Sequence, residues 1–199
     1  AVSRELYLGK YEVREITAPH GMVLNPEPHC VELVYAGQNV AVTETATSFE
    51  NERQKVEISL VKSIEQNKHF GIGTNGEMNN ISFGLFAAEE IVSASGTSIP
   101  ANGLVEIISL NEDGTAKVKT DLPFGSYYVQ ELATDSHYML SDEKYPVIFA
   151  YAGQEIPVVE LAVNDGKSIT NEMIYGEIHG MKKDEDGNVV LKEDGTPET

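Results

Sequence analysis

Three polar residues of complementary chemistry, Lys62, Glu131 and Asn171, lie where alternating apolar residues indicate the buried face of a β-strand. Each shares the parity of the apolar residues around it, so each side chain is expected to point toward a core. For any one of them, a strand one residue shorter would leave the side chain at the solvent-exposed rim. Burial of all three would be costly unless they satisfy one another, so the coincidence predicts that they meet.

A buried lysine and a buried carboxylic acid can react in ways that their exposed forms cannot. Desolvation lowers the pKa of a lysine and raises that of a glutamic acid, so a buried Lys62–Glu131 pair can exist as a neutral amine and a neutral acid. A neutral amine is a nucleophile. The side-chain carboxamide of Asn171 is the third group that the strand pattern aims at the same core.

The chain that must position these groups has 199 residues, enough for one or two domains with a real core. It carries 14 Lys and Arg against 32 Asp and Glu, for a formal net charge of -18. This charge argues against nucleic acid and anionic membranes as partners. No apolar run reaches the roughly 18 residues of a membrane span, and the charged residues 1–20 predict no signal peptide within this stretch.

The remaining reactive side chains predict no cofactor and no metal. Cys30 is the only cysteine, so an intrachain disulfide is excluded, and we expect a buried or idle thiol because the neighbouring His29 would face the other way on a strand. The five histidines lack metal-ligand spacing. The segment 184–188 fits a hairpin turn better than a calcium loop.

Short alternating runs separated by Gly, Asn, Asp and Pro predict an all-β sandwich, with one short helical turn near Ala87–Glu90. The predicted strands are Lys10–Thr17, Cys30–Ala36, Ala41–Glu52, Val56–Ser63, Ile81–Ala87, Val105–Leu110, Ala116–Asp121, Ser126–Leu132, Pro146–Ala152, Ile156–Ala162 and Ser168–Ile174.

The sequence also repeats itself at a period of about 120 residues. The matching segments are Gly9–Glu15 with Gly125–Glu131 and Tyr35–Gln38 with Tyr151–Gln154, both offset by 116, and Phe49–Glu52 with Ile169–Glu172 and Glu57–Lys62 with Glu177–Lys182, both offset by 120. We therefore predict that residues 1–53 are the C-terminal half of a repeat, that residues 54–174 are one complete repeat, and that residues 175–199 begin a further one. The open edges of the two partial copies invite strand exchange, in the same or a neighbouring molecule.

The order and spacing of four features resemble the B-type repeats of collagen-binding adhesins, a module that also builds the shafts of sortase-assembled pilins on Gram-positive bacteria. These features are Lys62 at the end of a strand, Phe-Gly-Leu-Phe at 83–86, Leu-Pro-x-Gly-x-Tyr-x-x-x-Glu at 122–131, and Asn-Glu at 171–172. The resemblance implies a SpaA-like fold: a reverse-immunoglobulin, prealbumin-like Greek-key β-sandwich, in tandem repeats, with a spontaneous isopeptide bond. A long polar segment, Gln66–Asn80, and His137 depart from the family pattern without touching the reactive positions.

By position, the resemblance implies that Lys62 is the reactive lysine, Asn171 its partner and Glu131 the catalytic acid. Lys62 would attack the Asn171 side-chain carbonyl while Glu131 hydrogen-bonds the carbonyl oxygen and passes a proton to the departing ammonia. Apolar neighbours would exclude water from the reaction. By analogy with a disulfide of similar span, the closed loop would stabilise the fold by about 4–5 kcal/mol.

The partial copies carry only parts of this set. The resemblance maps Glu15 and Asn51 onto the catalytic acid and the acceptor in the first copy. In the last copy it maps Lys182 onto the reactive lysine, with Lys183 as a possible rival.

These features together predict a structural stalk segment of a cell-wall-anchored adhesin or pilin, outside the cell, whose only reaction is one turnover on itself. Its expected partners are the neighbouring repeats of the same chain. The alternative is a binding module whose sandwich loops, including Gln66–Asn80, hold a host matrix protein. That segment has Phe70 as its only aromatic residue, whereas the centre of a binding patch is usually apolar or aromatic.

Overall fold

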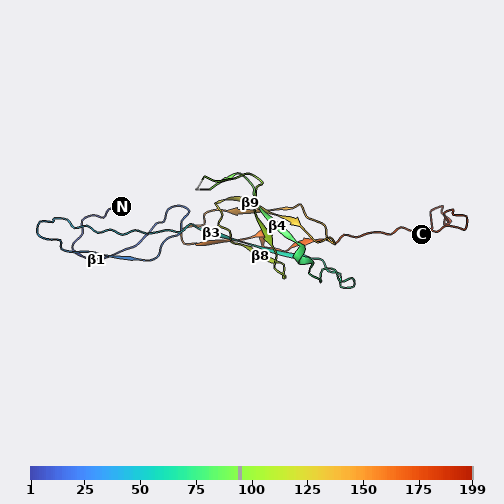
Figure 1. The fold of residues 1–199 in the computed structure, drawn as a ribbon, viewed down its shortest axis with the longest axis horizontal. Coiled ribbons are helices and arrows are strands. Elements are labelled where there is room, and N and C mark those ends of the chain that lie inside the picture. Colours follow the sequence, from blue (N-terminus) through green and yellow to red (C-terminus); the bar gives the residue numbers. More distant parts are fainter. Residues whose placement is uncertain (94–95, 199) are drawn as a thin grey trace.

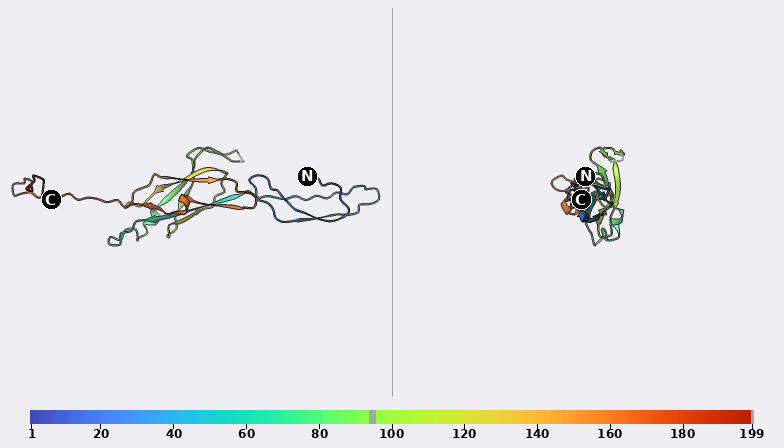
Figure 2. Two further views of the ribbon diagram at one scale, coloured as in Figure 1. Left: turned by 180° about the vertical axis from the view of Figure 1, so that it is seen from behind. Right: turned by 90° about the vertical axis from the view of Figure 1, so that its left-hand side faces the viewer.

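The computed structural model describes residues 1–93 and 96–198. Figure 1 shows an elongated molecule with a central β-sandwich (residues 54–174), an N-terminal unit (residues 1–53) at one end and a C-terminal tail (residues 175–198) extending from the other. The opposite view in Figure 2 shows the same succession. No helix among the described residues is long and apolar enough to span a membrane.

Two sheets of four strands form the central sandwich. The first is antiparallel, in the order β10 (Lys144–Phe149), β9 (Gly125–Ala133), β4 (Ser82–Ala87) and β7 (Leu104–Ser109). The second is built around β3 (Lys55–Ile64), which pairs with β11 (Val158–Ala162), β12 (Ile169–Asn171) and β8 (Thr115–Val118). Strands β11 and β12 run parallel to successive halves of β3, whereas β8 is antiparallel to it. The predicted all-β sandwich is confirmed.

The core lies between these two sheets because each contributes one alternating apolar face. Along β3, Val56, Ile58 and Leu60 are buried while the residues between them are more exposed. Tyr127 and Val129 on β9 form part of the opposing wall of the same cluster. Strand periodicity thus places every second residue in the core, as the sequence pattern predicts.

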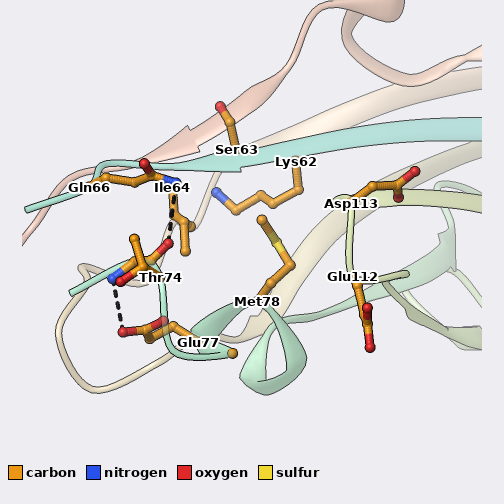
Figure 3. Close-up of a pocket in the computed structure, with 11 residues that line it drawn as sticks. Lys62, Ser63, Ile64, Gln66, Thr74, Glu77, Met78, Glu112 and Asp113 are labelled. Atoms are coloured by element: carbon orange, nitrogen blue, oxygen red, sulfur yellow. Dashed lines mark hydrogen bonds between the residues drawn. The ribbon is translucent and has the colours of Figure 1, made fainter. Parts of the chain in front are cut away.

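Smaller elements surround the sandwich. Strands β5 (Ile91–Val92) and β6 (Ser98–Ile99) form a short hairpin, and two 3₁₀ turns, η1 (Glu77–Asn80) and η2 (Val163–Gly166), follow strands. The polar segment before η1 folds over the end of β3 and helps to enclose a cavity of about 350 Å³. Lys62, Glu77 and Asp113 are among its lining residues (Figure 3).

Two predictions of secondary structure are wrong. Residues 41–52 do not form a strand, although they alternate; the corresponding segment of the sandwich, β11, is paired with β3, and residues 41–52 have no such partner. The helical turn near Ala87–Glu90 is absent because Ala87 continues β4. Its backbone N–H donates to the carbonyl of Gly103, and its carbonyl accepts from Asn102.

The N-terminal unit contains β1 (Gly9–Val13) and β2 (His29–Leu33), which form an antiparallel pair. Their register repeats that of β9 and β10, because Tyr11 pairs with Val31 as Tyr127 pairs with Val147. The bridge between Met22 and Arg53 likewise has a counterpart between Tyr138 and Met173. The repeat in the sequence is therefore accompanied by a repeat in backbone pairing.

Two glutamines of the central sandwich form its junction with the N-terminal unit. The backbone N–H of Gln54 donates to the carbonyl of Gly21 at 3.0 Å, and the Gln54 side chain holds the loop that carries Gln154. The buried side chain of Gln54 donates to the carbonyls of Gly153 and Ile156 at 2.9 and 2.6 Å and accepts from the N–H of Ala152 at 2.8 Å. In the other direction, the side-chain oxygen of Gln154 accepts from the N–H of Ala18 at 2.9 Å. These bonds make a specific junction between the two parts.

Candidate functional site

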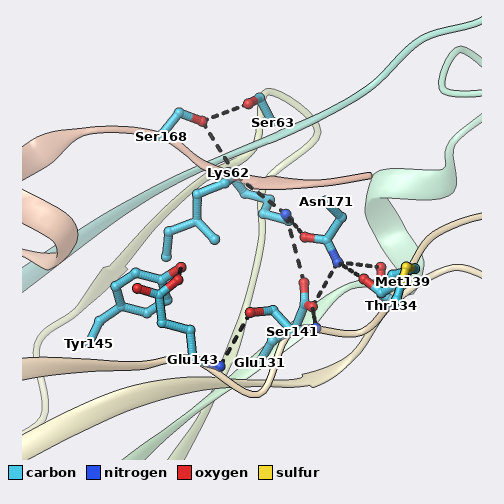
Figure 4. Close-up of polar contacts among 11 residues, drawn as sticks. Lys62, Ser63, Glu131, Thr134, Met139, Ser141, Glu143, Tyr145, Ser168 and Asn171 are labelled. Atoms are coloured by element: carbon cyan, nitrogen blue, oxygen red, sulfur yellow. Dashed lines mark hydrogen bonds and ion pairs between the residues drawn. The ribbon is translucent and has the colours of Figure 1, made fainter. Parts of the chain in front are cut away.

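Lys62, Glu131 and Asn171 meet in the interior of the central sandwich (Figure 4). They come from β3, β9 and β12, and their exposed fractions are 2%, 3% and 4%. Each continues the buried row of its strand, so the period-two pattern that builds the core also brings the three polar groups together.

The amine of Lys62 is held against the side chain of Asn171. Lys62 Nζ donates a hydrogen bond to Asn171 Oδ1 and a second to the carbonyl of Ile169 at 3.3 Å. The nearest carboxylate oxygen, Glu131 Oε1, is 3.8 Å from Nζ. The nucleophilic atom therefore lies next to a carboxamide and near a proton acceptor.

The nitrogen of the same carboxamide faces acceptors on its other side. Asn171 Nδ2 donates to Glu131 Oε2 and to the carbonyl of Met139, both at 2.7 Å, and lies 3.3 Å from Thr134 Oγ1. These contacts fix the orientation of the side chain, with oxygen toward the amine and nitrogen toward the carboxylate. We expected Glu131 to contact the carbonyl oxygen; it contacts the nitrogen instead, because Lys62 occupies the oxygen's side.

The carboxyl group of Glu131 bridges the two reacting ends of this cluster. Its Oε2 accepts the N–H of Ser141 at 2.9 Å in addition to Asn171. Its Oε1 is buried and has no hydrogen-bond partner. A buried oxygen without a hydrogen-bond partner is costly, and this oxygen faces the Lys62 amine at 3.8 Å.

Burial dominates the electrostatics of Lys62. Removal from water lowers the pKa of its amine to about 8, while the nearby Glu131 carboxylate acts in the opposite direction. A substantial fraction of the amine is therefore neutral near physiological pH. The surrounding walls are apolar, since the neighbouring side chains of Ile58, Tyr127 and Ile169 are almost completely buried.

A second glutamate–asparagine pair lies in the N-terminal unit. Asn51 Nδ2 donates to Glu15 Oε2 at 2.6 Å and to the carbonyl of Val23 at 2.9 Å. The N–H of Asn25 donates to the same Glu15 oxygen at 2.8 Å. These three bonds repeat those of Asn171, Glu131, Met139 and Ser141 in the sandwich, but Glu15 and Asn51 are only half-buried.

Lys182 is not brought to this second pair. Its amine pairs with Glu198 at 2.7 Å, and its side chain is 59% exposed. The tail that carries Lys182 and Lys183 extends from one end of the sandwich, and the N-terminal unit lies at the opposite end (Figures 1 and 2). Among the described residues, Glu15 forms no ion pair.

Sequence reasoning missed the residues that orient the carboxamide, namely Thr134, Met139 and Ser141. Two of them act through backbone groups, which no side-chain pattern reveals. The internal repeat offered a signal, because Val23 and Asn25 stand 116 residues before Met139 and Ser141. Cys30 is a free, exposed thiol on β2, and the described residues contain no cluster of metal-binding side chains.

Comparison with solved structures identifies the fold. The Bacillus anthracis TIE protein matches 98% of this chain and 32% of its own length, with 19% identity and a TM-score of 0.52. The pilus 2b backbone protein of group B streptococcus matches 66% of this chain and 47% of its own, with 15% identity and a TM-score of 0.38. The chain thus spans about a third to a half of these proteins.

No curated protein matches the sequence. A family model does: the one described as the SpaA prealbumin-like fold domain matches residues 62–167, which are more than half of the chain. The match begins at Lys62 and includes Glu131, and it agrees with the two-sheet architecture. The chain therefore belongs to the family of SpaA prealbumin-like fold domains.

Proposed function

We propose that this chain is a structural segment of a bacterial surface stalk, in which Lys62 and Asn171 form an isopeptide bond once, during folding. The observation that carries the proposal is the buried amine of Lys62 against the Asn171 carboxamide, with Glu131 near both. Family membership supports the fold on which this arrangement depends.

The reaction exchanges one amide nitrogen for another. Lys62 Nζ attacks Asn171 Cγ, the Nζ–Cγ bond forms, the Cγ–Nδ2 bond breaks, and ammonia leaves. The amine loses one proton and the departing nitrogen gains one, so no co-reactant is needed. Proximity in the folded state supplies what an unactivated amide lacks.

In this proposal Glu131 relays the proton. Its Oε1 can accept a proton from Lys62 Nζ, and its Oε2 lies 2.7 Å from the nitrogen that must receive one. The N–H of Ser141 holds the carboxyl group in this orientation. Met139 and Thr134 keep the leaving nitrogen on the side of the acid. This is general acid–base catalysis by one bifunctional group.

The product would change how the sandwich carries force. Strand β3 is the first strand of the sandwich and β12 the last, and they lie side by side in parallel. A covalent bond between Lys62 and Asn171 would carry tension from one end to the other without loading the core. A stalk outside the cell needs this property, and a chain with one cysteine cannot obtain it from an intrachain disulfide.

The protein would then react once with itself rather than act as an enzyme. Its partners would be the neighbouring repeats of the same chain, and the stalk would be anchored to the cell wall. The rival function, binding of a host matrix protein, gains little from the segment at 66–80. Phe70 is 72% exposed, but it is the only aromatic residue of the segment, and the cavity nearby is lined largely by polar side chains.

Intact mass spectrometry of the full chain under denaturing conditions tests the proposal. The wild-type monomer should be about 17 Da lighter than its sequence because ammonia is lost, and the Glu131→Gln variant should have its full sequence mass. An unshifted wild-type mass would overturn the isopeptide proposal and leave the three residues as a buried polar network.

A further inference from the structure

We propose that Tyr138 and Glu65 are positioning residues for the reaction between Lys62 and Asn171, and that their contacts set the separation of the amine from the carboxamide. This inference rests on the proposed function, because it concerns the rate of that reaction. It gives neither residue a part in making or breaking bonds, so it can fail while the reaction stands.

The hydroxyl of Tyr138 joins the connection between β9 and β10 to the strand that carries Lys62. The Tyr138 side chain is buried, with 2% exposed, and its hydroxyl donates to the carbonyl of Glu65 at 2.7 Å, one residue beyond the end of β3. The next residue in the connection, Met139, supplies the carbonyl that accepts from Asn171 Nδ2. One side chain therefore ties the lysine strand to the turn that orients the acceptor.

The carboxylate of Glu65 joins the same point to the strand that carries Asn171. Backbone pairing between β3 and β12 ends where Ile64 pairs with Asn171. Beyond that pair, Glu65 Oε2 accepts the N–H of Met173 at 3.2 Å, and its Oε1 accepts from the Tyr175 hydroxyl at 2.8 Å. A side chain thus continues the junction of the two strands past the reacting residues.

The polar segment 66–80 closes over the bond between Tyr138 and Glu65. A Cβ atom at Gly73 would lie 2.7 Å from the Glu65 carbonyl oxygen and 2.8 Å from the Tyr138 hydroxyl oxygen, and the backbone there has a φ of 81°, so the position requires glycine. The buried Glu77 carboxylate fixes this turn by accepting the N–H of Gly73 at 2.8 Å. The segment therefore packs directly against the hydroxyl and its acceptor.

The N-terminal unit indicates that such contacts are not needed to orient the acceptor. Met22 stands 116 residues before Tyr138 and has no hydroxyl, yet Asn51 keeps its hydrogen bonds to the glutamate and to the turn that follows Met22. In the sandwich the contacts reach the strand of Lys62 instead. Their effect is therefore on the separation of Lys62 Nζ from Asn171 Cγ, and a displacement of about 1 Å between reacting groups can slow a reaction on the order of 100-fold.

Refolding of the full chain from denaturant, before it has reacted, provides the test. The time course of the loss of about 17 Da measures the rate. Tyr138→Phe removes one oxygen and keeps the buried ring, and it should slow bond formation on the order of 10-fold while the final mass equals that of the reacted variant. Tyr128→Phe is the matched control and should react at the wild-type rate, because its hydroxyl donates to Asn102 at 3.1 Å on the outer face of the same sheet.

Variants of Glu65 test the same point without touching Tyr138. Glu65→Ala removes the acceptor of the Met173 N–H and should slow the reaction on the order of 10-fold. Glu65→Gln keeps a side-chain oxygen that can accept this N–H, so it should restore most of the rate. A Glu65→Gln variant as slow as Glu65→Ala would remove Glu65 from the assignment.

The dependence of the rate on pH separates position from protonation. The slow variants displace the amine of Lys62 without changing its charge, so they should lose the same factor below and above pH 8, near the pKa of about 8 that burial gives this amine. Slowing that disappears above pH 8 would overturn the inference, because it would mean that the pKa of Lys62 had risen instead.

The remaining outcomes separate this inference from the proposed function. A Tyr138→Phe variant that reacts at the wild-type rate overturns the inference and leaves the reaction intact. Equal slowing in Tyr128→Phe overturns it as well, since a general loss of stability would then explain both. A wild-type chain that loses no mass overturns the proposed function itself.

Discussion

The central sandwich and the N-terminal unit hold the same glutamate–asparagine pair in different surroundings. In the sandwich, Glu131 and Asn171 are almost completely buried and face the amine of Lys62. In the N-terminal unit, Glu15 and Asn51 make the same hydrogen bonds but are half-buried, and no lysine among residues 1–93 and 96–198 pairs with Glu15. A local turn is therefore enough to orient the acceptor, whereas burial and the lysine depend on a complete second sheet.

The largest expected difference between the two regions is the effect of removing the acid. Glu131→Gln should prevent the bond and lower the free energy of unfolding by about 4–5 kcal/mol, because the loop between residues 62 and 171 is no longer closed. Guanidinium unfolding measures this change. Glu15→Gln is the matched control, and it should leave the monomer mass unchanged and cost far less. Equal losses in both variants would remove the distinction between the regions.

The rate at which Lys62 and Asn171 form the isopeptide bond should depend on pH, because the Lys62 amine must be neutral to react. Because burial lowers the pKa of Lys62 to about 8, the amine is protonated and unreactive below this pH and neutral above it. Protein refolded from denaturant before it has reacted should form the bond about 50-fold faster at pH 8 than at pH 6, in proportion to the neutral amine. The time course of the mass loss measures the rate. A rate that falls as pH rises would contradict the assigned nucleophile.

The junction between the two regions should respond indirectly to Gln54, because its side chain holds the loop that carries Gln154, which in turn binds Ala18. Gln54→Ala removes three part-buried hydrogen bonds to residues 152–156, with an expected cost of about 1–3 kcal/mol. Hydrogen exchange should accelerate in residues 16–24 while β3 remains protected. Unchanged exchange in residues 16–24 would show that other contacts hold the junction.

The smallest effect is expected for the exposed ion pair between Arg53 and Asp121, which also spans the junction. Both side chains are about half exposed, so Asp121→Asn should change the free energy of unfolding by less than about 1 kcal/mol. Thermal unfolding at low and high salt measures it. A larger loss would mean that the two regions are coupled through charge rather than through Gln54.

The sequence was sufficient to predict the chemical core of the site. Strand parity alone placed Lys62, Glu131 and Asn171 on one buried side, because a period of two leaves no other face for them. The orientation of the carboxamide was not predictable in this way. It depends on Thr134 and on the backbone of Met139, whose positions are set by the connection between β9 and β10 in the folded chain.

The secondary-structure predictions were wrong where tertiary hydrogen bonding, rather than the local sequence pattern, determines the structure. Residues 41–52 alternate as a strand does, but a strand needs a partner for its backbone groups, and β3 pairs with β11 instead. The helical turn near Ala87 failed for the opposite reason, since the backbone there is already bonded to residues 102 and 103. Local propensity was overridden by tertiary contacts in both cases.

The central claim is that the glutamate–asparagine pair reacts where a lysine is buried with it. Tandem mass spectrometry of a proteolytic digest of the monomer tests it most directly, because it locates the bond. We predict one branched peptide that joins the segment containing Lys62 to the segment containing Asn171, about 17 Da lighter than their sum, and an unmodified Asn51 peptide. Unlinked Lys62 and Asn171 peptides from the wild-type monomer would contradict the claim.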